Sequence, residues 1–292
     1  MLFKGTGVAI VTPFKKDKKI DFDALGHIVD HCINGQTDYI VALGTTGEAV
    51  TLSREEKKRV VRYVIDAVAG RVKVVIGIGG NETEKVVNTI KQTEFSGISG
   101  LLSVTPYYNK PSQLGLIKHY KAIAAKSPVP VILYNVPART GVNMTSETTL
   151  TLASEVDNIV AVKEASGQMT QIMEIIKNRP SEFAVISGDD SLSLPIVALG
   201  GHGVISVAAN AFPKQMSAII REALNNNYAT AQSAHYEMLE IFGGLSVEGN
   251  PSGIKAALEI CGLAKNILRL PLTPVSQKTY ERLEFLIKKL KV

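Results

Sequence analysis

The sequence predicts an α/β fold: a (β/α)8 barrel of the TIM type with a C-terminal helical extension. Short β-branched runs alternate with longer segments of helical periodicity, and eight such runs occur. Eight parallel strands with eight crossovers favour closure into a barrel over an open doubly wound sheet. The runs lie at 7–12, 39–43, 72–78, 100–104, 129–134, 159–163, 183–187 and 204–207.

Each interval between these runs is long enough for one helix. The clearest helix start is Ser53, because Ser53 and Glu56 form the Ser-x-x-Glu pattern of a capping box and predict a helix over 53–69. The intervals therefore supply the crossover helices that parallel strands require.

The chain continues well beyond the eighth run. We expect a helix to begin near Pro213, and roughly the last 65 residues have helical periodicity and no further strand. No linker rich in Gly and Ser separates the two parts. We therefore expect a barrel over 1–225, which holds the active site, and a helical region over 226–292 that packs on it.

The composition argues against several classes of protein. The net charge is +5, but the basic residues are mixed with acids and lack interleaved aromatics, so we expect no nucleic-acid partner. Cys32 and Cys261 have no Cys-x-x-Cys spacing, so neither a disulfide framework nor a thiolate zinc site is implied. No apolar stretch approaches the ~20 residues that cross a bilayer, and the N-terminus lacks a signal-peptide pattern. We expect a cytoplasmic protein with no membrane partner.

A barrel of this kind places its active site at the carboxyl ends of the strands. The residues that follow the predicted strands carry hydroxyls, phenols, one guanidinium and one amine. They include Thr45, Thr46, Tyr107, Tyr108, Tyr134, Arg139 and Lys163. We therefore expect these groups to converge on a single mouth.

Lys163 closes the sixth run, and period-two alternation places it on the same face as Ile159 and Ala161. If that face is the barrel interior, desolvation disfavours the charged amine and leaves a nucleophile for a carbonyl carbon. A lysine at a strand end is more often a solvated surface residue, so the interpretation depends on its neighbours.

The neighbours favour the catalytic interpretation. Tyr134 ends the adjacent run and can carry protons to and from the Lys163 amine, while Thr45 can link one phenol to another. Thr46 lies in a Gly-flanked turn that can present a hydroxyl and an N–H to a carboxylate. Arg139 suits bidentate capture of a second carboxylate.

Other candidate sites are weaker, and we expect neither a metal nor a cofactor. His27 and His31 have helical spacing but no third ligand nearby. Gly77, Gly79 and Gly80 do not complete a Gly-x-Gly-x-x-Gly fingerprint, and they follow the third strand and not the first.

Five motifs in order give the whole chain a resemblance to a known family. They are GTTGE at 44–48, TPYY at 105–108, YNVPARTG at 134–141, KEASG at 163–167 and GVISV at 203–207. With these motifs the chain resembles the dihydrodipicolinate synthases of the pyruvate-dependent N-acetylneuraminate lyase family, which are class I, Schiff-base lyases.

The resemblance implies that Lys163 condenses with pyruvate and that Thr46 holds the pyruvate carboxylate. Arg139 is then expected to bind the carboxylate of L-aspartate 4-semialdehyde. The backbone at Gly188 and Ile205 is expected to line the pocket. The product implied is 4-hydroxy-tetrahydrodipicolinate, the first committed intermediate of the diaminopimelate route to lysine.

The resemblance also implies a proton relay and an assembly. Thr45, Tyr134 and Tyr108 would form the relay, with Tyr108 reaching in from a neighbouring subunit. Members of the family are commonly homotetramers built as dimers of dimers, so a homotetramer is expected here.

Two alternatives remain open. One is a retro-aldol lyase of the same family that acts on N-acetylneuraminate or another 2-keto-3-deoxy sugar acid. Such lyases usually carry Gly-Ser-Thr-Gly-Glu after strand two and lack the arginine at the position of Arg139. The other is a catalytically silent barrel that senses pyruvate-like ligands, against which the joint presence of Lys163, Tyr134 and Tyr108 argues.

Feedback inhibition by lysine is expected to be weak or absent. Lysine-sensitive members of the family bind the effector at a dimer-interface cleft with a serine, two histidines, an asparagine, a glutamate and a tyrosine. Asn81 and Tyr107 match that set here. The serine, the two histidines and the glutamate are replaced by Ala49, Arg54, Lys57 and Lys85.

Overall fold

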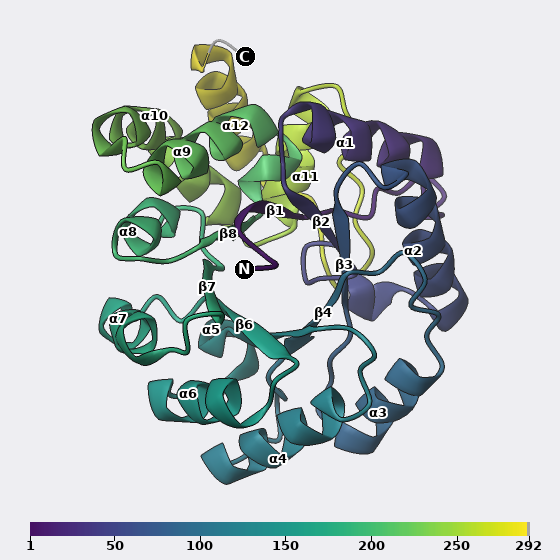
Figure 1. Cartoon of the computed structure of the whole chain (residues 1–292). Coiled ribbons are helices and arrows are strands. Elements are labelled where there is room, and N and C mark those ends of the chain that lie inside the picture. The colour runs from purple at the N-terminus through teal and green to yellow at the C-terminus, as the bar shows by residue number, and fades with distance from the viewer. Residues whose placement is uncertain (291–292) are drawn as a thin grey trace.

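The computed structural model describes residues 1–290. Eight parallel strands form a closed barrel in chain order, and β1 pairs with β8 to complete it. Figure 1 looks along this barrel, with the helices arranged around it. The predicted (β/α)8 architecture is therefore confirmed. The strands are β1 Gly5–Ala9, β2 Tyr39–Ala42, β3 Lys73–Gly77, β4 Gly100–Val104, β5 Val131–Asn135, β6 Ile159–Glu164, β7 Ala184–Ser187 and β8 Gly203–Ser206.

The outer layer and the C-terminal region are helical. The helices are α1 Phe22–Asn34, α2 Arg54–Val68, α3 Thr83–Lys91, α4 Gln113–Ala124, α5 Pro137–Thr140, α6 Ser146–Glu155, α7 Met169–Asn178, α8 Ser193–Ala198, α9 Pro213–Leu224, α10 Tyr228–Ser246, α11 Ser252–Ile260 and α12 Gln277–Lys289. The capping box at the start of α2 is confirmed, since the Ser53 side chain accepts from the Glu56 N–H and the Glu56 carboxylate accepts from the Ser53 N–H. The start of α9 at Pro213 also agrees with the sequence prediction.

The first strand is the one most displaced from its prediction. The run 7–12 was expected, but β1 ends at Ala9 because the following residues bond to other parts of the chain. The Val11 N–H donates to the Asn210 Oδ1 at 2.9 Å, and the Thr12 hydroxyl donates to the Gly47 carbonyl at 2.7 Å. The Ile10 N–H still donates to the Val41 carbonyl of β2 at 3.0 Å, so the chain leaves the sheet at residues 11 and 12.

Two clusters of buried side chains make up the core. The smaller one fills the barrel interior and includes Phe3, Tyr39, Val75, Ile132 and Ile205. The larger one lies between the strands and the helices. This arrangement follows from the alternation of side chains along each strand, which sends successive residues to opposite faces.

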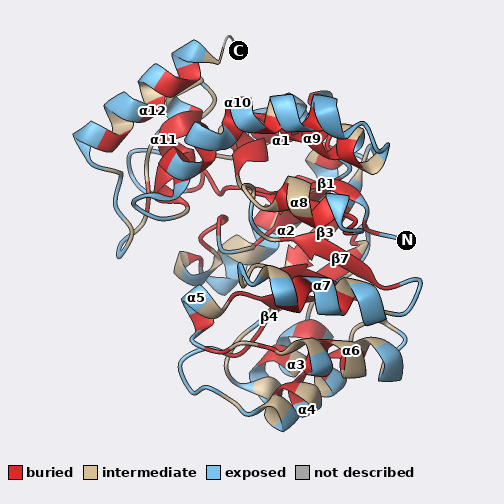
Figure 2. Ribbon diagram, turned by 90° about the vertical axis from the view of Figure 1, so that its left-hand side faces the viewer, coloured by how far each residue is buried: buried red, intermediate tan, exposed pale blue. Residues whose placement is uncertain are grey.

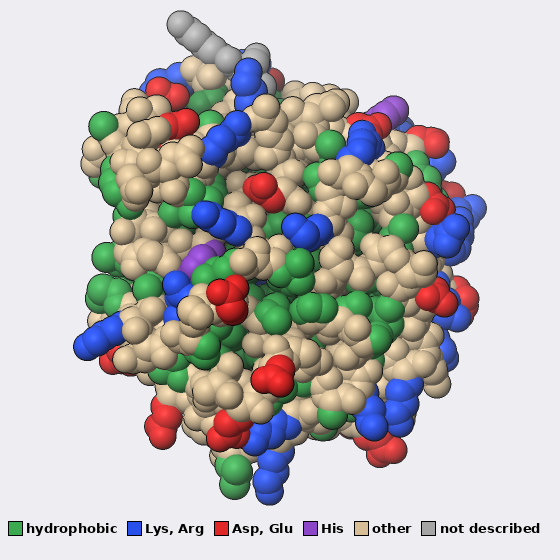
Figure 3. Space-filling model, viewed as in Figure 1, with side chains coloured by type: hydrophobic (Ala, Val, Ile, Leu, Met, Phe, Trp, Pro, Cys, Tyr) green, Lys and Arg blue, Asp and Glu red, His purple; other side chains and the backbone are tan. Residues whose placement is uncertain are grey.

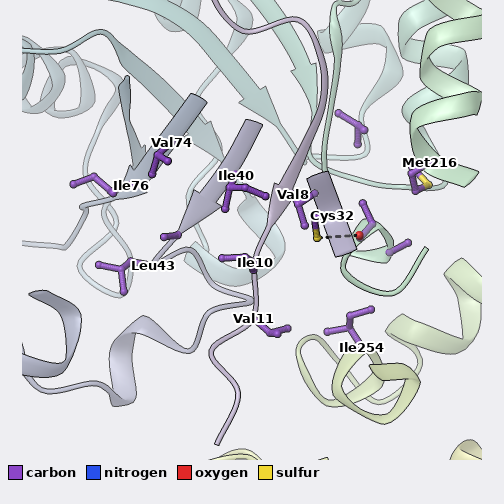
Figure 4. Close-up of a cluster of buried hydrophobic side chains, with 14 of the residues drawn as sticks. Val8, Ile10, Val11, Cys32, Ile40, Leu43, Val74, Ile76, Met216 and Ile254 are labelled. Carbon is purple, nitrogen blue, oxygen red and sulfur yellow. Dashed lines mark hydrogen bonds between the residues drawn. The ribbon is translucent and has the colours of Figure 1, made fainter. Parts of the chain in front are cut away.

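The C-terminal helices pack on the barrel through the larger cluster. Figure 4 draws Ile254 of α11 together with Val11 and Met216, and all three belong to that cluster. Residues 261–276 between α11 and α12 are not helical, although they lie within the last 65 residues, for which helical periodicity is expected. Pro271 and Pro274 in this stretch lack the N–H that a helix interior requires.

Figure 2 separates the two ends of the barrel. The N-terminus lies at one end, whereas α5 and α11 lie at the other, to which the strands run. Among the described helices none is long and apolar enough to span a membrane. On the face shown in Figure 3, Lys and Arg side chains are scattered among Asp and Glu, as the mixed charge pattern of the sequence predicts.

Candidate active site

Lys163 and Tyr134 lie side by side at the ends of two neighbouring strands. Tyr134 of β5 is in register with Lys163 of β6, and the Lys163 Nζ lies 4.3 Å from the centre of the Tyr134 ring. Lys163 is 5% exposed and Tyr134 is 7% exposed. Such a largely dehydrated amine next to a phenol has the surroundings that a nucleophilic lysine and its proton carrier require.

Of the two residues predicted to share the face of Lys163, only one does so. Ala161 belongs to the inner cluster, as expected, but Ile159 belongs to the outer one. The reason is an irregularity in the pairing of β5 with β6, because Val131 pairs with Ile159 whereas Ile132 pairs with Ala161. A residue inserted in this way reverses the face of every side chain before it.

A glycine makes room for the Lys163 side chain. A Cβ at Gly188 would lie 3.1 Å from the Lys163 Cε and 2.6 Å from the Ala165 Cβ, so any larger residue would displace one of them. The Gly188 N–H donates to the Glu164 carbonyl at 2.7 Å, which holds the glycine against β6. Ile205 is fully buried in the same inner cluster as Tyr134.

The loop after β2 carries two hydroxyls and a buried carboxylate. Thr45 is exposed, whereas Thr46 is 2% exposed and Glu48 has no exposed surface. Glu48 has a φ of 51°, in the left-handed region, so other contacts must hold the loop in this shape. In the described part of the chain, no hydrogen bond joins the Thr45 hydroxyl to Tyr134.

The Glu48 carboxylate forms a buried ion pair with Lys255 of α11 and also accepts the Arg269 N–H at 3.1 Å. The Lys255 ammonium donates to the Ile267 carbonyl at 2.9 Å and lies 4.1 Å from the centre of the Phe14 ring. Burial lowers the pKa of Lys255 to about 8, while the Glu48 carboxylate acts in the opposite direction. The C-terminal region thus fixes the loop that carries Thr45 and Thr46.

Asn250, just before α11, connects two of the predicted substrate-binding residues. Its Nδ2 donates to the Thr46 Oγ1 at 3.0 Å, and its backbone carbonyl accepts from the Arg139 guanidinium at 3.1 Å. Arg139 is otherwise exposed at the mouth. The structure therefore brings Thr46 and Arg139 to one residue of the C-terminal region.

Tyr108 does not lie with the other predicted site residues. It is 89% exposed and has a φ of 73°, which is rare for a bulky side chain. Tyr107 beside it is 37% exposed. Within a single chain, the Tyr108 side chain is therefore not buried with Lys163 and Tyr134.

Sequence reasoning missed three residues of this site: Glu48, Lys255 and Asn250. Glu48 could have been noticed as an acid beside two hydroxyls in a mouth loop. Lys255 and Asn250 carry no local signal, because they lie 207 and 204 residues from their partners.

The described residues offer no alternative metal centre. Within residues 1–290, no group of three or more His, Cys, Asp and Glu side chains is arranged to hold a metal ion. His27 and His31 lie on α1, and the His31 Nε2 lies 3.1 Å from the Ala211 carbonyl oxygen. The available chemistry is that of an amine, hydroxyls, phenols and a guanidinium.

Two cations lie close together between α2 and α3. Burial, and secondly the charge of Lys85, lower the pKa of Lys57. The nearby Arg54 donates from its guanidinium to the Gln92 Oε1 at 2.7 Å. Lys57 and Lys85 therefore place two like charges close together at this surface.

Known proteins are similar to this chain over nearly its whole length. A 4-hydroxy-tetrahydrodipicolinate synthase of Parabacteroides distasonis is 51% identical over 289 residues, covering 99% of this chain and 97% of that protein. A structure described as the first monomeric dihydrodipicolinate synthase variant has a TM-score of 0.97 at 39% identity and covers 99% of this chain and 97% of its own. The synthase of Cyanidioschyzon merolae, solved with lysine bound, has a TM-score of 0.95 at 38% identity and covers 99% of both chains.

A family model gives the same result by a separate route. The model described as the dihydrodipicolinate synthetase family matches residues 2–290, which include all eight strands and α12. With this match and a relative more than half identical along its length, the chain belongs to the dihydrodipicolinate synthetase family.

Proposed function

We propose that this protein is a class I, Schiff-base lyase that condenses pyruvate with L-aspartate 4-semialdehyde to 4-hydroxy-tetrahydrodipicolinate. The observation that carries the proposal is the buried Lys163 amine, 4.3 Å from the centre of the Tyr134 ring inside the barrel. The activity for which the Parabacteroides relative is named supports the choice of reaction. Lysine and diaminopimelate biosynthesis is the pathway that this reaction serves.

The chemistry assigned to Lys163 needs proton transfers in both directions. The neutral amine attacks the carbonyl carbon of pyruvate, and the carbinolamine that forms loses water to give the Schiff base. The carbonyl oxygen must gain protons and the nitrogen must lose one, and we assign this transfer to Tyr134, linked through Thr45 to Tyr108. Loss of a proton from the methyl group of the adduct gives the carbon nucleophile that attacks the aldehyde.

Two groups at the mouth would hold the carboxylates. We assign the pyruvate carboxylate to Thr46, which is buried and already held by Asn250. We assign the semialdehyde carboxylate to Arg139, whose guanidinium is exposed at the mouth. The backbone at Gly188 and Ile205 would line the pocket between them.

Trapping with borohydride tests the proposal. Pyruvate with borohydride should inactivate the protein and leave a reduced pyruvyl adduct on Lys163, mapped by peptide mass spectrometry. Lys163→Ala should give no adduct and almost no turnover. An adduct on another lysine, or full activity of Lys163→Ala, would contradict the Schiff-base assignment.

The second substrate separates the alternatives. A coupled assay should show turnover with aspartate semialdehyde and none with sialic acid under equal conditions. Preference for sialic acid would favour the retro-aldol lyase. A single-turnover experiment that traps pyruvate but forms no product with either partner would favour a sensing barrel.

We further propose that the protein works as a homotetramer, a dimer of dimers, in which Tyr108 completes the relay of a neighbouring subunit. The 89% exposure of Tyr108 on a strained loop supports this, because such a side chain gains from burial in a partner. Mixed Tyr108→Phe and Lys163→Ala subunits should regain activity in hybrids, where one site receives both intact residues. Proven subunit exchange without recovery would place Tyr108 in its own site, and sedimentation would give the assembly.

The division of the chain also enters the proposal. We propose an active-site barrel over 1–225 and a packed helical region over 226–292, whose last two residues lie outside the described part. The contacts of Lys255 and Asn250 with the mouth loops support one cooperative unit. A cytoplasmic location is supported by the free thiols of Cys32 and Cys261 and is tested by cell fractionation.

A further inference from the structure

Directly behind the Lys163–Tyr134 pair lies a second pair in the same register. β5 and β6 pair Tyr134 with Lys163 and, one residue further, Asn135 with Glu164. Because successive side chains point to opposite faces of a strand, the first pair faces the barrel interior and the second faces the surrounding helices. Asn135 has no exposed surface and Glu164 is 1% exposed.

The Glu164 carboxylate is held by neutral donors. The Asn135 Nδ2 lies 3.2 Å and 3.1 Å from its two oxygens, the Gln171 Nε2 donates to it at 3.1 Å, and the Ser166 N–H donates at 2.7 Å. Burial raises the pKa of Glu164, and these hydrogen bonds lower it. No ion pair of the described chain includes Glu164. Burying a carboxylate without a cation is costly, so its presence here needs a reason.

The same hydrogen bonds extend to the loops of the mouth. The Asn135 Oδ1 accepts from the Met144 N–H at 3.0 Å, and its Nδ2 also donates to the Asn143 Oδ1 at 2.8 Å. Asn143 in turn donates to the Gln171 Oε1 at 2.8 Å. The network therefore joins β5, β6, α7 and the segment that follows Arg139.

We propose that Glu164 and Asn135 are positioning residues that fix β5 against β6 at the mouth and so hold the Lys163 amine at the Tyr134 phenol. This rests on the proposed Schiff-base function. The backbone ladder sets the register of the two strands. One Asn135 N–H shared between the two Glu164 oxygens, together with the Gln171 and Ser166 donors, adds directional contacts that hold the ends of the strands at that register. Proton transfer from a carbinolamine is sensitive to displacements of about 1 Å, so a loosened register should slow the chemistry more than it weakens binding.

The test is the Glu164→Gln variant. It replaces one of the two accepting oxygens by an NH2 group, so that the Asn135 and Gln171 amides no longer both find an acceptor. We expect the rate constant of Schiff-base formation, followed by borohydride quenching and intact mass, to fall about 10- to 100-fold at saturating pyruvate. The half-saturating pyruvate concentration should change much less. Where this variant does not fold, Gln171→Met removes one donor at similar volume and should lower the same rate constant by a smaller factor.

Exchanging the amide and the carboxylate between positions 135 and 164 should restore the rate of Schiff-base formation. In the double variant Asn135→Asp with Glu164→Gln, the amide and the carboxylate change places, and the new glutamine can donate to the new aspartate. The double variant should recover most of the lost rate. Tyr120→Phe is the matched control, because it removes a buried hydrogen bond from the Tyr120 hydroxyl to the Ser103 carbonyl behind the barrel. It should lower the melting temperature without changing the rate of adduct formation.

The outcomes separate this inference from the proposed function. If the parent protein forms the adduct on Lys163 and Glu164→Gln forms it at the same rate, only the positioning role is overturned. A slow single variant that the exchange fails to rescue would also overturn it, since the pairing would then not be the cause. No adduct in the parent protein would overturn both.

Discussion

The buried ion pair between Glu48 and Lys255 allows the most quantitative prediction. Its partners are 0% and 1% exposed at the side chain, and they join the loop after β2 to α11. Lys255→Met keeps a side chain of similar length but removes the positive charge, its hydrogen bonds and the contact of the ammonium with the Phe14 ring. The Glu48 carboxylate would then stay buried with the Arg269 N–H as its remaining described donor.

The expected loss is large because the remaining buried carboxylate loses its direct ion-pair partner and keeps only the more distant charge of Arg269. Removing one partner of a buried pair typically costs about 3–5 kcal/mol, and the retained Arg269 N–H places this variant near the lower end, at about 3 kcal/mol. That corresponds to roughly a hundredfold change in the folding equilibrium. Pyruvate affinity should also fall, because Thr46 lies in the loop that the pair holds.

Urea unfolding followed by circular dichroism at fixed protein concentration measures the loss. Lys121→Met is the matched control, since Lys121 forms a half-exposed surface pair with Glu155 and its loss should cost below about 1 kcal/mol. The double variant Glu48→Gln with Lys255→Met removes both charges and should regain most of the stability.

Two results would refute this reasoning. One is a Lys255→Met variant that unfolds at the same urea concentration as the Lys121→Met control. The other is a double variant no more stable than Lys255→Met alone, because the loss would then not arise from the stranded carboxylate.

Three further predictions concern the mouth and the effector cleft. Arg139→Ala should raise the KM for the semialdehyde and cost about 2–4 kcal/mol in kcat/KM while pyruvate trapping stays intact; equal damage to both substrates would make the arginine structural. Gly188→Ala should slow borohydride trapping at least tenfold, because its Cβ would lie 3.1 Å from the Lys163 Cε; unchanged trapping would show that the Lys163 side chain has room to move. Lysine should inhibit weakly or not at all, because Lys57 and Lys85 repel its ammonium. Half-inhibition well below 1 mM lysine, where 1 mM corresponds to a binding free energy of about −4 kcal/mol, would contradict this. Lys85→Glu replaces a repelling charge by an attracting one and should strengthen inhibition by lysine.

Sequence patterns alone predict the architecture and the end of the barrel at which most of the candidate site residues lie. Eight runs with crossover intervals lead to a closed barrel because parallel neighbours and buried faces leave few other arrangements. Once the barrel is known, Thr46, Tyr134 and Lys163 must lie at one mouth, since they follow strands that run in the same direction. The alternation rule also placed Lys163 with Ala161 inside the barrel.

Local rules fail where the pairing is irregular. Ile159 lies on the outer face because the β5–β6 register shifts beside it, and periodicity within one strand carries no information about its neighbour. β1 ends at Ala9 for a similar reason, because the groups that bond residues 11 and 12 come from Asn210 and Gly47.

Only the tertiary structure showed what holds the site in place. Glu48 meets Lys255, Thr46 meets Asn250, and Asn135 meets Glu164 across 207, 204 and 29 residues of sequence. Each of these contacts joins polar groups that are individually unremarkable in sequence, and none repeats with the period of a helix or a strand. They form because closing the barrel and folding the C-terminal helices onto it bring these groups together away from water, where a polar group without a partner is too costly to keep.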